Sequence, residues 1–307
     1  MLPVPAFNTA CGEGVGIAAC PVLKVLVTAS AMDLKVFALP DSLVTKPGAM
    51  TIIRTIGGVE PFMFRFFFGG FYSGWMAFTG CASDTRLLVV VDAGNGAVHV
   101  IDVVHGQHVG YVAAPGSIAR PRGVAAWGTK DVAVCCDSET VRFYKGSRET
   151  WTVVRVIDIG SHFRHFVIGL RFTRDGTGLA LVRRRAERSC VDVICVEDGS
   201  FVSTVSIDAV YPVDLEDCGE HGWAVSNWSS HRIQFIGGAN GQICLDDGEF
   251  VHPTSLALVP GLGLMVRDYQ DGGRLRLFAT PDAIAMAAMS ISKATWMMAV
   301  ARSTRMI

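Results

Sequence analysis

The densest charge cluster of the chain is a run of arginines whose guanidinium groups could hold carboxylates or phosphates. It comprises Arg183, Arg184, Arg185 and Arg188, with Glu187 inside the run. A local basic field of this kind attracts an acidic protein or RNA. The solvated tip of a hairpin carries the same composition, so the sequence leaves both interpretations open.

Two histidines come nearest to a metal-binding pattern. His162 and His165 lie three residues apart around Arg164 in the segment SHFRHF. A zinc site needs a third and a fourth ligand, which would have to come from elsewhere in the chain. We therefore predict exposed loop histidines and no bound metal.

Motifs for the common catalytic chemistries are missing from the sequence. Neither phosphate-binding pattern, G-x-G-x-x-G after a strand or G-x-x-x-x-G-K-[ST], occurs, and neither G-x-S-x-G nor H-E-x-x-H is present. Asp214 and Glu216 are the only apparent carboxylates on a predicted inner strand. We predict no cofactor and no catalytic residue.

Composition indicates a globular, intracellular chain. Of the 307 residues, 50% are hydrophobic and 18% are charged, with a formal net charge of -1. This balance fits a folded domain and lacks the positive excess of a general nucleic-acid binder. The nine cysteines are odd in number and form no C-x-x-C pair, so we expect reduced thiols and a cytosolic protein. The N-terminus lacks the pattern of a signal peptide.

An internal repeat is the strongest signal in the chain. Short alternating runs of β-branched residues follow polar turns in register. Their central residues are separated by 62, 43, 50, 42 and 42 residues. Four of these five gaps are close to the length of a four-stranded propeller blade, and an insertion between the first two blades explains the gap of 62. These central residues are Val36, Val98, Val141, Val191, Ile233 and Leu275.

Each copy has three companion strands, so one unit reads a, b, c, d with a turn after each strand. The predicted inner strands begin at Pro121, Val167, Pro212 and Pro253. One such meander cannot bury both faces, and radial stacking leaves only short sheet edges. We predict an all-β, six-bladed β-propeller of four-stranded antiparallel blades over residues 1–282.

Two blocks resemble the NHL-repeat family. DAGNGAVHVI from Asp92 and NWSSHRIQFI from Asn227 resemble its Asp, turn Asn and following strand, and the segments at Pro121 and Pro253 resemble the start of that repeat. Blades one and four depart from the pattern, with SAMDLK and RRRAERSC in place of the Asp–Asn turn. The resemblance implies a six-bladed propeller that serves as a protein- and RNA-binding platform.

The b–c and d–a loops of a propeller share one face, which we predict to be the partner-binding face. Phe71 and Tyr72, from the aromatic segment Pro61–Phe78, either extend this surface over the channel mouth or pack in the core. The basic residues expected on the face are Arg120, Arg122, His162, Arg164, His165, Arg183, Arg184, Arg185 and Arg188.

The two chain ends are expected to complete the ring. Blade six lacks a fourth strand, which either Leu2–Phe7 or part of the tail after Pro281 could supply. Residues 283–300 are apolar and long enough to span a bilayer. Polar residues cluster in the middle of this segment, where a membrane span would be penalised; they are Ser290, Ser292, Lys293 and Thr295. We therefore predict that the tail, residues 283–307, is a helix or strand packed on the propeller, in preference to a membrane span.

The predicted function is a non-catalytic scaffold for a protein partner, with RNA as a second candidate and membrane association disfavoured. The alternative is a divalent-metal-dependent lactonase or esterase-like hydrolase, since six-bladed lactonases of the gluconolactonase type hold a cation on the channel. The acidic residues Asp92, Asp137, Asp268 and Asp271 are assigned instead to b–c turn chemistry.

Overall fold

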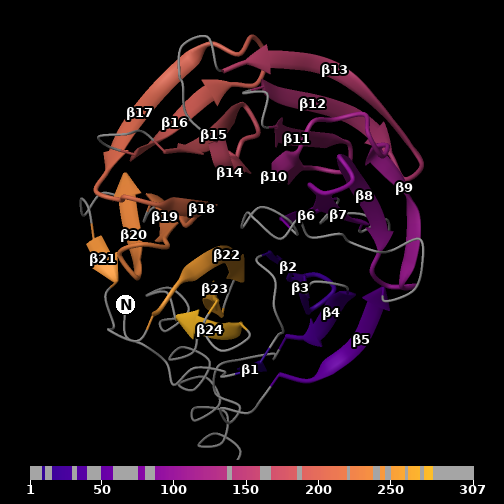
Figure 1. The fold of residues 1–307 in the computed structure, drawn as a ribbon, viewed down its shortest axis with the longest axis horizontal. Coiled ribbons are helices and arrows are strands. Elements are labelled where there is room, and N and C mark those ends of the chain that lie inside the picture. The colour runs from indigo at the N-terminus through magenta and orange to yellow at the C-terminus, as the bar shows by residue number, and fades with distance from the viewer. Residues whose placement is uncertain are drawn as a thin grey trace, which may run out of the picture.

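The protein is a ring of six four-stranded antiparallel sheets (Figure 1). A computed structural model describes residues 9–10, 16–29, 33–39, 50–57, 75–79, 87–136, 140–159, 167–184, 189–219, 222–237, 243–245, 250–259, 262–269 and 273–278. The first strand of each four-stranded unit lies nearest the centre of the ring and the last lies at the rim (Figure 1).

The blades follow one another in chain order, each with strands a to d running from the centre outward. Blade 1 consists of β2 (Ile17–Cys20), β3 (Val25–Ala29), β4 (Asp33–Ala38) and β5 (Ile52–Gly57). Blade 2 consists of β6 (Met76–Thr79), β7 (Leu87–Asp92), β8 (Ala97–Asp102) and β9 (Gln107–Ala113). Blade 3 consists of β10 (Pro121–Trp127), β11 (Asp131–Cys136), β12 (Thr140–Ser147) and β13 (Thr150–Asp158).

The second half of the ring repeats this order. Blade 4 consists of β14 (Val167–Phe172), β15 (Gly178–Arg183), β16 (Ser189–Cys195) and β17 (Phe201–Ile207). Blade 5 consists of β18 (Pro212–Asp217), β19 (Gly222–Asn227), β20 (Arg232–Gly237) and β21 (Ile243–Leu245). Blade 6 consists of β22 (Pro253–Val259), β23 (Gly263–Asp268), β24 (Arg274–Phe278) and the N-terminal β1 (Thr9–Ala10).

The predicted propeller is therefore confirmed, including the inner strands that begin at Pro121, Val167, Pro212 and Pro253. The predicted central residue of blade 1, Val36, is wrong by two residues. Leu34, which pairs with Ala29 at the end of its hairpin, is the blade 1 counterpart of Val98, rather than Val36. A shift of two residues keeps the same side of a strand, which is why the period-2 pattern did not reveal it.

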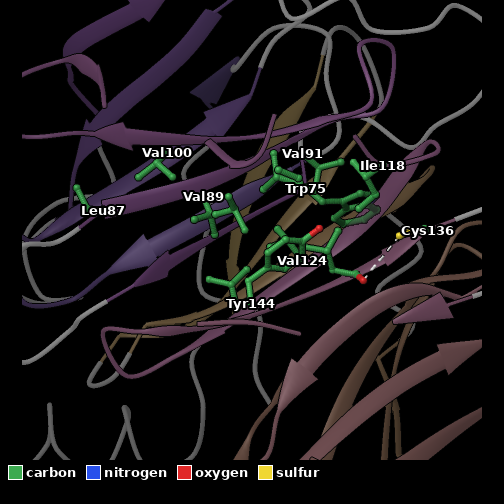
Figure 2. Packing of buried hydrophobic residues seen from close by; sticks show 14 of the residues in the cluster. Trp75, Leu87, Val89, Val91, Val100, Ile118, Val124, Cys136 and Tyr144 are labelled. Atoms are coloured by element: carbon green, nitrogen blue, oxygen red, sulfur yellow. Dashed lines mark hydrogen bonds between the residues drawn. The ribbon is translucent and has the colours of Figure 1, made fainter. Parts of the chain in front are cut away.

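The core consists of side chains packed between neighbouring blades. On β7, Leu88 and Val90 pack toward blade 1, while Val89 and Val91 pack toward blade 3. Figure 2 shows the second of these layers, where Val89 and Val91 lie with Val124 of β10. Because both faces of a b strand are covered, its sequence is a continuous apolar run instead of an alternating one.

The N-terminal end of the chain closes the ring, as expected for one of the two chain ends, but through Thr9–Ala10, which lies in neither of the two predicted segments. Thr9 pairs with Leu275 and Ala10 with Arg274, so β1 becomes the outer strand of blade 6. A buried guanidinium adds a second link between the first and last blades. Nη1 of Arg267, on β23, donates to the carbonyl oxygens of Gly16 (3.2 Å) and Ala29 (2.8 Å).

Two predictions on the chain ends remain predictions. The segment Leu2–Phe7 and the tail, residues 283–307, lie outside the described residues. Within the described part of the chain, no helix is long and apolar enough to cross a membrane.

Candidate functional site

Blades 5 and 6 each carry a pair of ring-bearing residues in the loops next to their a and b strands. Tyr211 directly precedes Pro212 of β18, and Trp228 directly follows Asn227 of β19. The backbone N–H of Trp228 donates to the carbonyl oxygen of Tyr211 at 2.9 Å. In blade 6 the equivalent residues are His252 and Tyr269, joined by the equivalent bond at 3.0 Å. The same backbone hydrogen bond therefore joins the residue before the a strand to the residue after the b strand in both blades.

The pairs of neighbouring blades stack on one another. The rings of Trp228 and His252 lie 4.2 Å apart with an interplanar angle of 6°. Arg184, directly after β15 in blade 4, places its guanidinium carbon 4.2 Å from the ring centroid of Tyr211. The residue after a b strand thus packs on the residue before the a strand of the next blade.

Two further rings complete this cluster, which we name the aromatic arc. Tyr269 lies 5.4 Å from Trp228, and His231, in the b–c turn of blade 5, lies 5.1 Å from His252. His231 is exposed, and the other members are partly exposed. The arc comprises Arg184, Tyr211, Trp228, His231, His252 and Tyr269, all in b–c or d–a loops and hence on one face of the ring.

Buried polar side chains at the ends of the b strands fix the backbone of the d–a loops that carry arc residues. Asp268, the last residue of β23, accepts the backbone N–H groups of His252 (2.7 Å) and Val251 (3.0 Å). Asn227, the last residue of β19, accepts the backbone N–H of Tyr211 at 3.3 Å. Asp268 therefore anchors a d–a loop, which corrects its assignment to b–c turn chemistry, whereas Asp92 does accept the backbone N–H of Asn95 within its own turn (3.0 Å).

Hydrogen bonds fix the tautomers of both arc histidines. Nδ1 of His252 contacts the carbonyl oxygen of Trp228 at 3.3 Å, and Nδ1 of His231 contacts that of Val251. A carbonyl only accepts, so each Nδ1 carries the hydrogen. In each ring Nε2 is then the nitrogen that can accept a hydrogen bond from a ligand.

The structure separates the predicted basic residues into different environments. Arg120 is exposed, and Arg184 belongs to the arc. Arg122 is only 9% exposed, within an irregularity of β10, and Arg183 is 1% exposed. The expectation that Arg183 belongs to an exposed hairpin tip is wrong, because β15 continues through this residue and turns its side chain into the blade.

Arg183 belongs to a structural pair that recurs around the ring. It forms a buried ion pair with Asp192 of β16, and Asp192 also accepts a hydrogen bond from Thr204. The same two positions of blade 6 carry Asp268 and Arg276, with the charges exchanged. Blade 2 has Asp92 and His99 there, 3.2 Å apart. Arg183 is thus explained by packing and not by partner binding.

The remaining predicted site residues fall outside the residues that the structure describes. They are Phe71, Tyr72, His162, Arg164, His165, Arg185 and Arg188, together with the turn residues Asp137 and Asp271.

The two inner-strand carboxylates form an ion-pair network and not a cation site. Arg171 of β14 lies 3.4 Å from Asp214 and 3.1 Å from Glu216, both on β18. Burial raises the pKa of both carboxyl groups, and the charge of Arg171 opposes that rise. Among the described residues no group of three His, Cys, Asp or Glu side chains could hold a metal ion. The positions equivalent to Arg171 in four other blades are Ala18, Ala77, Ala125 and Ala257.

Sequence reasoning found Arg184 but missed the rings of the arc. Their signal was present as an aromatic or His residue immediately before the a-strand proline, in Tyr211-Pro212 and His252-Pro253. A second signal was the aromatic residue directly after the polar end of a b strand. These two signals identify a site only when it is known that the b–c loop of one blade contacts the d–a loop that leads into the next blade.

Comparison with known proteins identifies the fold alone. No protein-family model matches the sequence, and no curated protein matches it. Among solved structures, the WD40 β-propeller domain of Doa1 has a TM-score of 0.57 at 10% identity, covering 87% of this chain and 79% of that one. The β-propeller domain of Cps50 (Swd1) from Myceliophteria thermophila has a TM-score of 0.55 at 11% identity, covering 88% and 97%.

A chain in the crystal structure of a mitotic checkpoint complex has a TM-score of 0.58 at 12% identity, covering 91% of this chain and 96% of that one. These identities are too low to transfer function. The class is nevertheless plain: the protein is a six-bladed β-propeller, and its fold is similar to that of a WD40 β-propeller domain.

Proposed function

We propose that the protein is a non-catalytic scaffold that docks a partner protein on the face formed by its b–c and d–a loops. The aromatic arc carries this proposal, because it presents rings from blades 5 and 6 and a guanidinium from blade 4 in fixed positions. Aromatic residues and arginine dominate the binding energy of protein interfaces. Rings already held by stacking lose little conformational entropy when a partner binds.

One feature supports a docking surface at this position, and a second supports a protein-binding role in general. Val210, next to Tyr211 in the d–a loop, is 71% exposed and extends the apolar surface of the arc. One of the structures with a similar fold is a chain of a mitotic checkpoint complex, which is an assembly of proteins. A propeller is rigid enough to hold such a surface, although the fold alone does not define a function.

Two finer assignments belong to the same proposal. We infer an NHL-type repeat, which the Asp92–Asn95 turn supports, since Asp92 accepts both the backbone N–H (3.0 Å) and the side-chain amide (2.7 Å) of Asn95. We also infer a cytosolic location. Four cysteines that the structure describes are free thiols, as a reducing compartment would keep them; they are Cys135, Cys190, Cys195 and Cys218.

The proposal is tested by removing rings from the arc. Trp228→Ala and His252→Ala are each expected to weaken capture of the partner by at least about tenfold, as loss of an interface hot spot does. Phe201→Ala is the matched control, because Phe201 is 52% exposed but lies on the outer strand β17, away from the loop face. A cross-linker at Val210→Cys identifies the docked segment. Unchanged capture by both arc variants contradicts the proposal.

A further inference from the structure

The guanidinium of Arg184 is positioned by a ring and not by an anion. Its carbon lies 4.2 Å from the centroid of Tyr211, and the residue is partly buried. Within the described part of the chain, Arg184 forms this contact and no ion pair or hydrogen bond. Its N–H donors therefore point at no described acceptor, although arginine at a half-buried position normally finds one.

Two described acidic residues at the d–a loops of the arc do not neutralise this arginine. Asp208 is exposed in the same d–a loop as Tyr211 and forms no ion pair in the described structure. Asp268 is buried, and its two oxygens already accept the N–H groups of Val251 and His252. Within the part of the chain that the structure describes, the arc thus presents one cation without a counter-charge beside stacked rings.

We propose that the arc binds an acidic segment of the partner protein, with one carboxylate forking onto Arg184. The planar guanidinium matches a carboxylate with two parallel hydrogen bonds, and stacking on Tyr211 fixes its orientation in advance. Residues flanking that carboxylate pack on Trp228 and His252. This inference rests on the proposed function and adds the chemistry of the partner.

A peptide carboxylate suits this site better than RNA. A nucleic acid is held by many phosphate contacts spread along a basic surface. Among the described residues the arc carries one guanidinium, that of Arg184, and the residue before Tyr211 is the exposed, apolar Val210. The chain as a whole has a formal net charge of -1. One directed anion contact next to aromatic and apolar side chains is typical of a protein interface.

The test compares two fluorescein-labelled decapeptides by fluorescence anisotropy. One alternates glutamate with leucine, and the other alternates glutamine with leucine. We expect the glutamate peptide to bind the protein at least about tenfold more tightly, and Arg184→Ala to abolish that preference. Arg184→Lys keeps the charge but loses the fork, so it should retain only part of the preference.

Matched variants separate this proposal from the docking surface itself. Arg174→Ala removes an arginine with a 65% exposed side chain on the opposite face and should leave the preference intact. Trp228→Ala should weaken both peptides by the same factor, because it removes packing and no charge. Equal affinity for the two peptides, no binding of the glutamate peptide, or a preference unchanged by Arg184→Ala overturns the acidic segment.

A twelve-nucleotide uridine RNA provides the other arm of the test. If it displaces the glutamate peptide and binds more tightly than the peptide does, the partner is a nucleic acid and the proposal is wrong. The proposed docking surface is tested separately, by whether Trp228→Ala weakens capture of the natural partner.

Discussion

The buried pair of Arg183 and Asp192 can be tested by removing one charge at a time. Their side chains are 1% and 2% exposed, so neither charge is stabilised by bulk water. Asp192→Asn leaves the guanidinium buried without its counter-charge. Breaking a buried ion pair in this way costs about 3–5 kcal/mol of unfolding free energy. Arg183→Met keeps much of the side-chain volume and leaves Asp192 its hydrogen bond from Thr204, so we expect a smaller loss.

A charge exchange provides the decisive comparison. In blade 6 the same two positions hold Asp268 and Arg276, which is the opposite polarity. The double variant Arg183→Asp/Asp192→Arg reproduces that arrangement in blade 4. Its buried charges are again paired, so we expect it to recover about 2 kcal/mol or more relative to Asp192→Asn.

The measurement is urea denaturation followed by the fluorescence of the six tryptophans. The exposed pair of Arg174 and Asp217 is the matched control, with side chains 65% and 21% exposed. Asp217→Asn should change the unfolding free energy by less than about 1 kcal/mol. If Asp192→Asn costs no more than this control, or the exchanged pair is no more stable than the single variant, Arg183 is not a structural residue.

Three shorter predictions concern other parts of the ring. Burial and the neighbouring His99 lower the pKa of His108 from 6.5 to about 4. The unfolded chain therefore takes up this proton at higher pH than the folded one, and about 1–2 kcal/mol should be lost, after allowance for solvent screening, as the pH falls from about 6.5 to 4. Urea titrations at several pH values should show this loss, and His108→Gln should remove it. Arg267→Met deletes the buried link to Gly16 and Ala29, so it should lower the unfolding free energy by about 2–4 kcal/mol and speed proteolysis of the N-terminus; an unchanged cleavage rate would contradict a role in closure. Gly169→Ala places a Cβ 3.0 Å from the backbone of Asp214 in the next blade, so a melting curve should show a loss of about 1–3 kcal/mol, whereas an unchanged curve would mean that the blades can move apart.

The architecture was predictable because each strand type leaves its own signature. Both faces of β7 are covered by neighbouring blades, so LLVVVD is apolar throughout, while β13 at the rim exposes Val153, Val154 and Val156. A turn follows each strand, and the four-strand unit recurs. Packing that depends only on strand period and spacing can be derived from one sequence.

The site was harder to predict because it depends on contacts between blades. Arg183 and Arg184 are consecutive and chemically identical, yet one is buried beside Asp192 and the other lies over Tyr211. Their environments differ because successive residues of a strand point to opposite sides, and because β15 ends at Arg183, the first of the two. The charge run alone does not reveal where the strand ends.

The same boundary explains how one repeat can serve both stability and binding. The last residue of a b strand lies inside the blade, where Asn227 and Asp268 support the d–a loops. The residue that follows lies outside, where Trp228 and Tyr269 are partly exposed. A substitution at the outer position alters the surface that a partner meets and leaves the buried anchor unchanged. Loss of binding in an arc variant can therefore be attributed to the surface when the unfolding free energy is retained, whereas a variant of Asn227 or Asp268 should lose both together.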